Sequence, residues 1–492
     1  MLLMAPPKRL ELGRSSTRTT MIQPRVSVIG LGKLGAAMAA AMASRGLPVV
    51  AVDLNQEAVE AVNRGRSPVE ETNLAALIAA NRSRLRATSD HIEAVLESDV
   101  TFVVVPTPSD ASGAFSLECA RAAFSAIGKA MKAKDSYHLV VLVSTVLPGA
   151  TRHGLLPVLE DASGKRSGVD FGLCYSPVFV ALGSVIHDFL NPDFHLVGEL
   201  DQRSGDTLST LLAQLVPGEI PCQRMSIENA EIVKISVNSF VTMKISFANL
   251  IAEFCGRIPG ADVDVVSAAV GLDRRIGRRY LTGGLGFGGP CFPRDNVALS
   301  FACGSVGVPT ELLEATDHFN RSHPARMMAN LEAVLPPAGG LVVVLGLAYK
   351  PHTTVVEESP GVHLALRLAE AGYRVRGHDP MANAEAKAAL DGKAEVVDSL
   401  KECLEGAETV LVTTPDPAFQ SLSADHFQAG GKKVVVVDFW RCLGKAITGH
   451  PNIRYVPLGR SVGSAASEGP PWVRTATPRT RTPKEPILQP IE

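Results

Sequence analysis

The sequence predicts an α/β protein with two parallel-sheet lobes joined by a long central helix and a helical middle domain. Three observations predict this fold. A strand, a glycine-rich turn, a helix and a second strand follow one another at residues 25–55. A similar unit recurs at residues 341–445, and an apolar helical stretch at residues 227–257 lies between the two. Strands that alternate with helices are typical of parallel sheets covered by helices.

The first unit has the pattern of a dinucleotide-binding motif. The strand at residues 25–29 runs into Gly-Leu-Gly-Lys-Leu-Gly at residues 30–35, and the strand at residues 48–52 ends at Asp53. Glycines in this pattern bring a pyrophosphate close to a helix N-terminus, and the acid suits ribose hydroxyls and would repel a 2′-phosphate. The sequence therefore predicts a Rossmann-like lobe that binds NAD through Gly30, Gly32, Lys33, Leu34, Gly35 and Asp53.

Two further strands of this lobe end in small polar residues. Residues 100–105 lead to Thr107, and residues 138–143 lead to Thr145. Because ligands of open α/β sheets bind at the carboxyl ends of the strands, both threonines are candidates to line the cofactor site. Ordinary strand-to-loop transitions give the same pattern, so these loops alone leave both interpretations open.

The central stretch is apolar nearly all round, which predicts a buried helix. It is long enough to link two lobes and to pack against a second subunit. Lys234 and Asn238 lie four residues apart and share one face. The lysine either extends its ammonium group to water along an apolar surface or is held as a cation in a functional site.

The unit at residues 341–445 is a degenerate repeat of the first lobe. A strand at residues 341–345, a turn at 346–350, a helix at 361–371 and a strand at 373–377 lead to Asp379. Residues 398–415 then mirror residues 90–108. Because the full glycine pattern is missing, this lobe is expected to bind something other than NAD.

Composition excludes several classes of protein. The chain has 492 residues, 46% of them hydrophobic and 20% charged, which predicts two or three soluble domains. A net charge of -2 provides no basic field for nucleic acid, and no uninterrupted apolar run reaches the roughly 18 residues that span a membrane. The eight cysteines lack zinc-like spacing, so we expect reduced thiols of a cytoplasmic protein and no metal.

Composition also suggests the domain boundaries. Residues 1–24, which contain Met21 as an alternative start, and residues 459–492 are rich in small polar residues and arginine, and we expect both to be disordered. Between them we expect a first lobe at residues 25–220, a central helical domain at 221–325 and a second lobe at 326–458.

The most informative stretch for chemistry is residues 283–295. Five glycines within residues 283–289 precede Cys291, and Asp295 follows one helical turn later. Such a run costs backbone entropy and is expected where a ligand approaches the backbone closely; a flexible loop beside a buried cysteine is the alternative. A lysine near the cysteine would lower the pKa of the thiol and bind an oxyanion, which makes Lys234 its expected partner.

Seven motifs in order give residues 25–445 a close resemblance to the UDP-glucose/GDP-mannose dehydrogenase family. They are the glycine motif at residues 30–35, Val-Pro-Thr-Pro at 105–108, Ser-Thr-Val-Leu-Pro-Gly at 144–149, Ala-Glu-x-x-Lys-x-x-x-Asn at 230–238, Asp-Arg-Arg-Ile-Gly at 273–277, Gly-Phe-Gly-Gly-Pro-Cys at 286–291 and Gly-Leu-Ala-Tyr-Lys at 346–350.

The resemblance implies an NAD-dependent 6-dehydrogenase that oxidises C6 of a nucleotide sugar, a UDP-hexose or UDP-N-acetylhexosamine, to a uronic acid for polysaccharide biosynthesis. It implies that Cys291 carries a thiohemiacetal and then a thioester. Lys234 and Asn238 would donate to the oxyanion, and Asp295 and Thr145 would hold and activate water. The implied substrate residues are Lys234, Asn238, Arg275, Gly286, Phe287, Gly288 and Lys350, with Arg275 reaching across a homodimer or higher homo-oligomer.

Four departures from the family pattern stand out, one of them the loss of a second acid at residues 179–183. Val178 replaces a glutamate that assists thioester hydrolysis, Glu357 replaces an arginine expected near phosphates, and Arg294 stands where lysine is usual. We therefore expect a divergent subgroup with another sugar nucleotide. Hydrolysis would be slower, or would depend on Asp295 and Thr145 alone, and Val178→Glu would speed turnover.

Two alternatives remain open. A β-hydroxyacid dehydrogenase of the 6-phosphogluconate type shares the glycine motif and the Lys/Asn helix, but needs neither Cys291 nor a second lobe. A catalytically weakened nucleotide-sugar-binding relative is suggested by Val178 and Glu357, and retention of the cysteine, lysine and asparagine argues against it.

Overall fold

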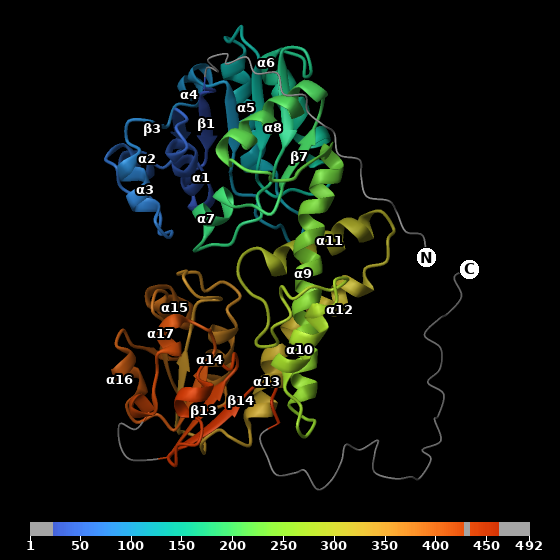
Figure 1. The fold of residues 1–492 in the computed structure, drawn as a ribbon. Coiled ribbons are helices and arrows are strands. Elements are labelled where there is room, and N and C mark those ends of the chain that lie inside the picture. Colours follow the sequence, from blue (N-terminus) through green and yellow to red (C-terminus); the bar gives the residue numbers. More distant parts are fainter. Residues whose placement is uncertain (1–22, 428–432, 462–492) are drawn as a thin grey trace, which may run out of the picture.

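A computed structural model describes residues 23–427 and 433–461. Two sheet-containing lobes lie at opposite ends of one long helix, α9 (Ile227–Cys255), with shorter helices packed along its lower half (Figure 1). This is the predicted α/β arrangement of two parallel-sheet lobes and a helical middle. The segment expected to be a disordered extension lies almost wholly outside the described residues, as does most of the expected tail.

Within the described residues, the first lobe is one eight-stranded sheet in the order β3-β2-β1-β4-β5-β6-β7-β8. Neighbouring strands are parallel except β6 and β7, which are antiparallel. The strands are β1 (Val26–Ile29), β2 (Val49–Val52), β3 (Leu85–Thr88), β4 (Val100–Val103), β5 (His138–Leu142), β6 (Phe171–Tyr175), β7 (His195–Glu199) and β8 (Cys222–Ser226). The expected domain end at residue 220 thus falls just before β8, which pairs within the first sheet.

Helices cover both faces of this sheet (Figure 1). They are α1 (Lys33–Ser44), α2 (Gln56–Asn63), α3 (Leu74–Ala80), α4 (His91–Glu97), α5 (Glu118–Met131), α6 (Leu156–Ser163), α7 (Val185–Leu190) and α8 (Gln202–Leu215), with a π-helical turn at Ala150–Leu155. Residues 35–43 of α1 are buried, and most are alanine. Small side chains let this helix lie close to the sheet, which fixes the glycine motif at its N-terminus.

The helix α9 begins at its Ser226 cap, as predicted, but it is only partly buried. Five large apolar side chains on it are between 45% and 59% exposed: Ile232, Phe240, Phe247, Leu250 and Phe254. The expected burial is incomplete within one chain, because the described residues cover only part of the helix circumference. By length and composition alone α9 could cross a membrane, with a mean hydropathy of 1.3 over 18 residues. Here it packs against β7, α11 and α12.

The middle of the protein is helical. Its helices are α10 (Val263–Leu272), α11 (Phe292–Ser305), α12 (Glu311–Arg321) and α13 (His323–Leu331). The segment between α10 and α11 contains the glycine-rich stretch and Cys291. Because α11 packs on both α9 and α12, the cysteine is held beside the long helix.

The six strands described in the second lobe form a wholly parallel sheet in the order β11-β10-β9-β12-β13-β14. They are β9 (Leu341–Leu345), β10 (Arg374–His378), β11 (Glu395–Val396), β12 (Thr409–Val412), β13 (Val434–Asp438) and β14 (Ile453–Pro457). The accompanying helices are α14 (Pro360–Glu370), α15 (Asn383–Leu390), α16 (Leu400–Leu404), α17 (Pro417–Gln420) and α18 (Gly444–Ile447), with a 3-10 turn at Ala424–Phe427.

The two lobes share their strand order and also local hydrogen bonds. Asp53 accepts from the backbone of Leu31 at 2.6 Å, and Asp379 accepts from Leu347 at 2.8 Å, at matching positions after the second strand. Asp99 likewise accepts from the backbone of Arg25, as Glu408 does from Leu341. The internal repeat read from the sequence is therefore also a repeat of contacts.

Candidate active site

The glycine motif lies at the carboxyl end of β1 and fits a dinucleotide. Gly30 has φ +102°, and a Cβ there would collide with the carbonyl oxygen of Val104. A Cβ on Gly35 would collide with the carbonyl of Gly30, so these two glycines serve the turn and the helix–strand contact. Gly32, the N-cap of α1, faces open space instead. An uncovered helix N-terminus beside Asp53 is what a pyrophosphate and a ribose require.

Thr107 and Thr145, the two predicted loop residues, lie together at this edge of the sheet. The hydroxyl of Thr107 donates to the carbonyl of Thr145 at 2.8 Å. The guanidinium of Arg294 donates to the carbonyl of Thr107 at 3.1 Å and stacks over the ring of Phe115 at 4.8 Å. Arg294 therefore connects the start of α11, three residues from Cys291, to the cofactor edge of the first lobe.

Cys291 occupies the N-cap of α11 and is exposed at the surface, although the residues around its sulfur desolvate the thiol. Pro293 lies in the first turn of that helix, where its missing N–H costs nothing. Asp295 lies one turn further on and is only 2% exposed. The start of α11 thus places a desolvated thiol and a buried carboxylate together beside α9.

Lys234 and Asn238 lie on one face of α9, as their spacing predicted, and that face meets this carboxylate. The amide of Asn238 donates to Oδ2 of Asp295 at 2.6 Å. The ammonium of Lys234 donates to the carbonyl of Val178 at 3.0 Å and lies 4.9 Å from the ring centre of Phe179. The structure therefore brings together the four predicted residues Cys291, Lys234, Asn238 and Asp295.

The four groups influence one another electrostatically. Burial raises the pKa of Asp295, and Lys234 opposes that change. Burial also lowers the pKa of Lys234, against the charges of Asp295 and Cys291. For Cys291, burial and the Asp295 carboxylate raise the thiol pKa more than Lys234 and Arg294 lower it. The lysine lowers the thiol pKa, as predicted, but the net pKa of the thiol is raised because desolvation is the larger effect.

The glycine-rich stretch is packed against protein on every side. A Cβ on each of its five glycines would meet a different neighbour. The pairs are Gly283 with Ala252, Gly284 with Trp440, Gly286 with Asn320, Gly288 with the carbonyl of Glu358 and Gly289 with Tyr349. Close packing of the chain on itself therefore accounts for this run, a reason that the sequence did not reveal.

A loop of the second lobe, residues 349–358, contacts both the first lobe and the cysteine segment. The backbone of Gly289 donates to the carbonyl of Glu357 at 3.0 Å. The ammonium of Lys33, in the glycine motif, donates to the hydroxyl of Thr354 at 3.3 Å. Burial lowers the pKa of Lys350, against the charges of Asp188 and Glu71 of the first lobe. This loop thus joins the cofactor motif to the nucleophile segment.

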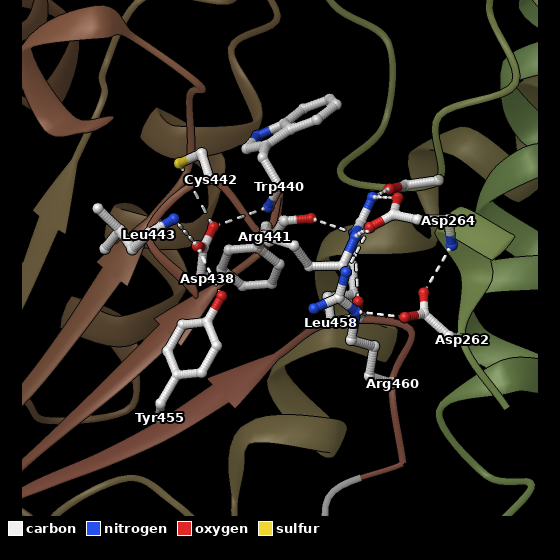
Figure 2. A network of polar contacts seen from close by, with 12 residues as sticks. Asp262, Asp264, Asp438, Trp440, Arg441, Cys442, Leu443, Tyr455, Leu458 and Arg460 are labelled. Carbon is white, nitrogen blue, oxygen red and sulfur yellow. Dashed lines mark hydrogen bonds and ion pairs between the residues drawn. The ribbon is translucent and has the colours of Figure 1, made fainter. Parts of the chain in front are cut away.

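Arg441 anchors the second lobe to the middle of the protein (Figure 2). Its side chain is 1% exposed and bonds both carboxylate oxygens of Asp264, at 2.9 and 3.0 Å. It also donates to the carbonyl of Gly283 at 2.7 Å. Arg460 bonds Asp264 and Asp262 beside it, so residues 459–461 are held against α10 although the expected tail begins at 459.

Two of the predicted substrate residues differ in their exposure to solvent. Arg275 is 87% exposed at the side chain and pairs with Asp273, in the turn after α10. Phe287 is buried, and its backbone N–H and carbonyl both bond the side chain of Asn320. Gly286 and Gly288 flank it. A contact of Arg275 with a substrate of another protomer stays a prediction.

Sequence reasoning missed two residues of this region. Tyr349 packs on Gly289, and the charge of Cys291 contributes to its raised pKa, after burial. Its position directly before Lys350 was the available signal. Gly361 lies in the first turn of α14, and a Cβ there would collide with the carbonyl of Gly346. In the same way, a Cβ on Gly35 would collide with the carbonyl of Gly30. The second lobe therefore keeps the third glycine of the motif, displaced by the inserted loop.

Comparison with known proteins agrees with this geometry. Three parts of the UDP-glucose/GDP-mannose dehydrogenase family match in order: the NAD binding domain at residues 24–216, the central domain at 228–322 and the UDP binding domain at 343–445. The chain belongs to this family. Its first lobe is accordingly the NAD-binding domain, and the protein is an oxidoreductase of the nucleotide-sugar 6-dehydrogenase type.

Relatives within the family act on different sugars. The chain is 37% identical over 414 residues to UDP-glucose 6-dehydrogenase AglM of Haloferax volcanii, covering 84% of this chain and 95% of that protein. It is 33% identical over 425 residues to GDP-mannose 6-dehydrogenase of Pseudomonas putida, with the same coverage. The structure of a UDP-glucose dehydrogenase from Pyrobaculum islandicum superposes with a TM-score of 0.81 at 34% identity, covering 91% of this chain and all of that one.

Proposed function

We propose that this family member oxidises the C6 primary alcohol of a nucleotide sugar to the carboxylate in two NAD-dependent steps, through a thioester on Cys291. The observation that carries the proposal is the convergence of Cys291, Lys234, Asn238 and Asp295 beside the cofactor edge of the first lobe. Bound NAD would accept the hydride that leaves C6 in each oxidation.

The protein residues would act on the charges that the reaction creates. The thiolate of Cys291 adds to the aldehyde carbon, and the carbonyl oxygen becomes an oxyanion. Lys234 and Asn238 lie where an ammonium and an amide can stabilise that oxyanion. Because the thiol pKa is raised in the described protein, the thiolate has to form within the site, next to the positive charge of Lys234. Thr145 and Asp295 would hold the water that ends the cycle.

The second lobe would hold the nucleotide. The ammonium of Lys350 lies in the loop that faces the first lobe, and burial lowers its pKa, so an anionic partner would raise that pKa again. Residues 286–288 lie next to that loop and would line the bound substrate. We favour a UDP-hexose or UDP-N-acetylhexosamine as the substrate, whose uronic acid product would supply polysaccharide synthesis.

A second protomer would complete the site. The exposed apolar side chains of α9, together with Leu272 and Ile276, are a surface that a second copy could cover. Arg275 lies at the edge of this surface with its guanidinium in solvent. We therefore propose a homodimer or higher homo-oligomer in which Arg275 reaches the substrate of its neighbour, and we place the enzyme in the cytoplasm with its soluble substrates.

One alternative has a specific motivation. Val178 offers no proton acceptor where the resemblance implies one, so a weakened nucleotide-sugar-binding protein would fit the same fold. A β-hydroxyacid dehydrogenase is disfavoured because it would use neither Cys291 nor the second lobe.

The test is the NADH yield from limiting nucleotide sugar. UDP-glucose, UDP-GlcNAc, UDP-ManNAc and GDP-mannose would be incubated in turn with excess NAD. We expect two NADH per molecule from one of these sugars. One NADH with a free aldehyde as the end product would indicate a simple alcohol dehydrogenase, and none from any of the four would favour the weakened relative.

A further inference from the structure

Two carboxylates act electrostatically on the Cys291 thiol, and they belong to different parts of the protein. Asp295 is 2% exposed, and one of its oxygens receives the amide of Asn238. It therefore faces the interior of the protein and α9. Glu357 belongs to the second-lobe loop and is exposed. The two acids differ in their access to bulk water, which matters for a step that consumes water.

The backbone around Glu357 is fixed against the nucleophile segment. Its carbonyl accepts the N–H of Gly289, two residues before Cys291, at 3.0 Å. The next carbonyl, of Glu358, lies so close to Gly288 that no side chain would fit there. These two contacts hold the loop and the segment together with little freedom to slide.

The carboxylate of Glu357 is free to act. None of the described residues forms a hydrogen bond or an ion pair with it. Burial and Asp295 raise the pKa of the Cys291 thiol, and the charge of Glu357 adds to this effect, so the carboxylate lies within electrostatic reach of the sulfur. The carboxylate of the neighbouring residue, Glu358, has a different partner: its Oε2 lies 4.0 Å from Nε2 of His363.

Val178 supplies no proton acceptor from its side chain. Its carbonyl binds Lys234, and its side chain packs against the core of the first lobe. An acyl group on Cys291 would thus have an ammonium and an amide on the α9 side. The exposed carboxylate lies on the side of the second lobe.

We propose that Glu357 is the general base that activates water for hydrolysis of the Cys291 thioester. The inference rests on the proposed function. Glu357 takes a proton from water as its oxygen bonds to the thioester carbon; the carbon–sulfur bond then breaks, and the thiolate leaves next to Lys234. The product is the sugar carboxylic acid, which ionises, and the proton on Glu357 passes to solvent. No electrons are exchanged in this step.

The test compares Glu357→Gln with Glu358→Gln, its exposed neighbour. NADH is followed in a rapid-mixing instrument with excess nucleotide sugar and NAD, and acylated Cys291 is measured by mass spectrometry after an acid quench. For Glu357→Gln we expect an initial burst of two NADH per site, followed by turnover about 100-fold slower than in the unmodified enzyme. Acylated Cys291 should accumulate, and hydroxylamine, which attacks thioesters without a base, should restore turnover. Glu358→Gln should behave like the unmodified enzyme.

Three results would overturn the proposal: unchanged turnover in Glu357→Gln, slow turnover without a burst or acyl-enzyme, or a changed KM for the nucleotide sugar at constant kcat. The last would assign Glu357 to phosphate binding. Failure of the proposed function itself looks different, because the unmodified enzyme and Glu358→Gln would then also fail to release two NADH per sugar.

Discussion

The amide of Asn238 donates a hydrogen bond of 2.6 Å to the carboxylate of Asp295. This contact joins α9 to the helix that begins at Cys291. The other oxygen of Asp295 is buried and has no hydrogen-bond partner in the described protein. Asn238 is therefore the amide that satisfies a buried carboxylate and also, in the proposed reaction, the group that faces the oxyanion.

Asn238→Ala should lower both stability and activity. Loss of the donor leaves a buried carboxylate without its hydrogen bond, which costs about 1–3 kcal/mol of unfolding free energy. Loss of an oxyanion donor lowers kcat about 100-fold or more. Urea denaturation and NADH production measure the two effects. Asn229→Ala, at an exposed position of the same helix, is the control, and equal effects from both variants would contradict the account.

Lys234→Met should make Cys291 less reactive. Burial raises the pKa of the thiol and Lys234 lowers it, so loss of the ammonium raises that pKa further and reduces the thiolate fraction. At pH 8 we expect alkylation of Cys291 by iodoacetamide to slow about tenfold. Because the pKa of Lys234 is itself lowered, the difference should shrink as the pH rises and that lysine loses its proton.

Peptide mass spectrometry separates Cys291 from the other thiols in this experiment. Exposed Cys119 lies on α5 and serves as the internal reference, because its alkylation should be the same in both proteins. Faster alkylation of Cys291 in the variant would show that Lys234 does not stabilise the thiolate.

Val178→Glu should restore hydrolysis where Glu357 has been removed. The carbonyl of Val178 already receives Lys234, so a carboxylate at this position would stand at the edge of the same site. In the Glu357→Gln background we expect steady-state turnover to rise at least tenfold. Val180→Glu is the matched control, since both valines pack partly against the first-lobe core. Equal turnover with Val178→Glu and with Val180→Glu, each combined with Glu357→Gln, would count against a hydrolysis step that is limited by the lack of a general base.

Arg441→Met should destabilise the protein by about 1–3 kcal/mol, because the buried carbonyl of Gly283 loses its donor, while Asp264 keeps Arg460 as a partner. Arg441→Lys should recover little of this loss, since an ammonium cannot bond two carboxylate oxygens and the Gly283 carbonyl in the same planar geometry. The comparison in urea denaturation is with Arg454→Met, at an exposed position of β14. Similar midpoints for Arg441→Met and Arg454→Met would contradict the anchoring role.

The sequence predicted those parts of the protein that depend on local pattern. The glycine motif, the spacing of Lys234 and Asn238 and the apolar strands each specify an element and the face it presents. The grouping of these residues with Cys291 followed from the family resemblance, and the hydrogen bond between Asn238 and Asp295 agrees with it.

What the sequence did not reveal depends on contacts between distant segments. The sign of the net pKa change at Cys291 is set by burial, which spacing along the chain cannot show. The packing of Gly284 on Trp440 and of Gly289 on Tyr349 joins segments far apart in sequence. The exposure of Phe240 and Phe247 depends on which neighbours cover α9, and an apolar helix pattern alone does not specify them.

The most direct test of the central claim is the NADH yield per nucleotide sugar in Cys291→Ser, with Cys119→Ser as the control. With the substrate identified by the panel of nucleotide sugars, Cys119→Ser should release two NADH per sugar and form the uronic acid. Cys291→Ser should release no more than one, because the second oxidation requires the sulfur adduct. Two NADH and a normal rate of uronic acid formation from Cys291→Ser would contradict a mechanism through a thioester on this residue.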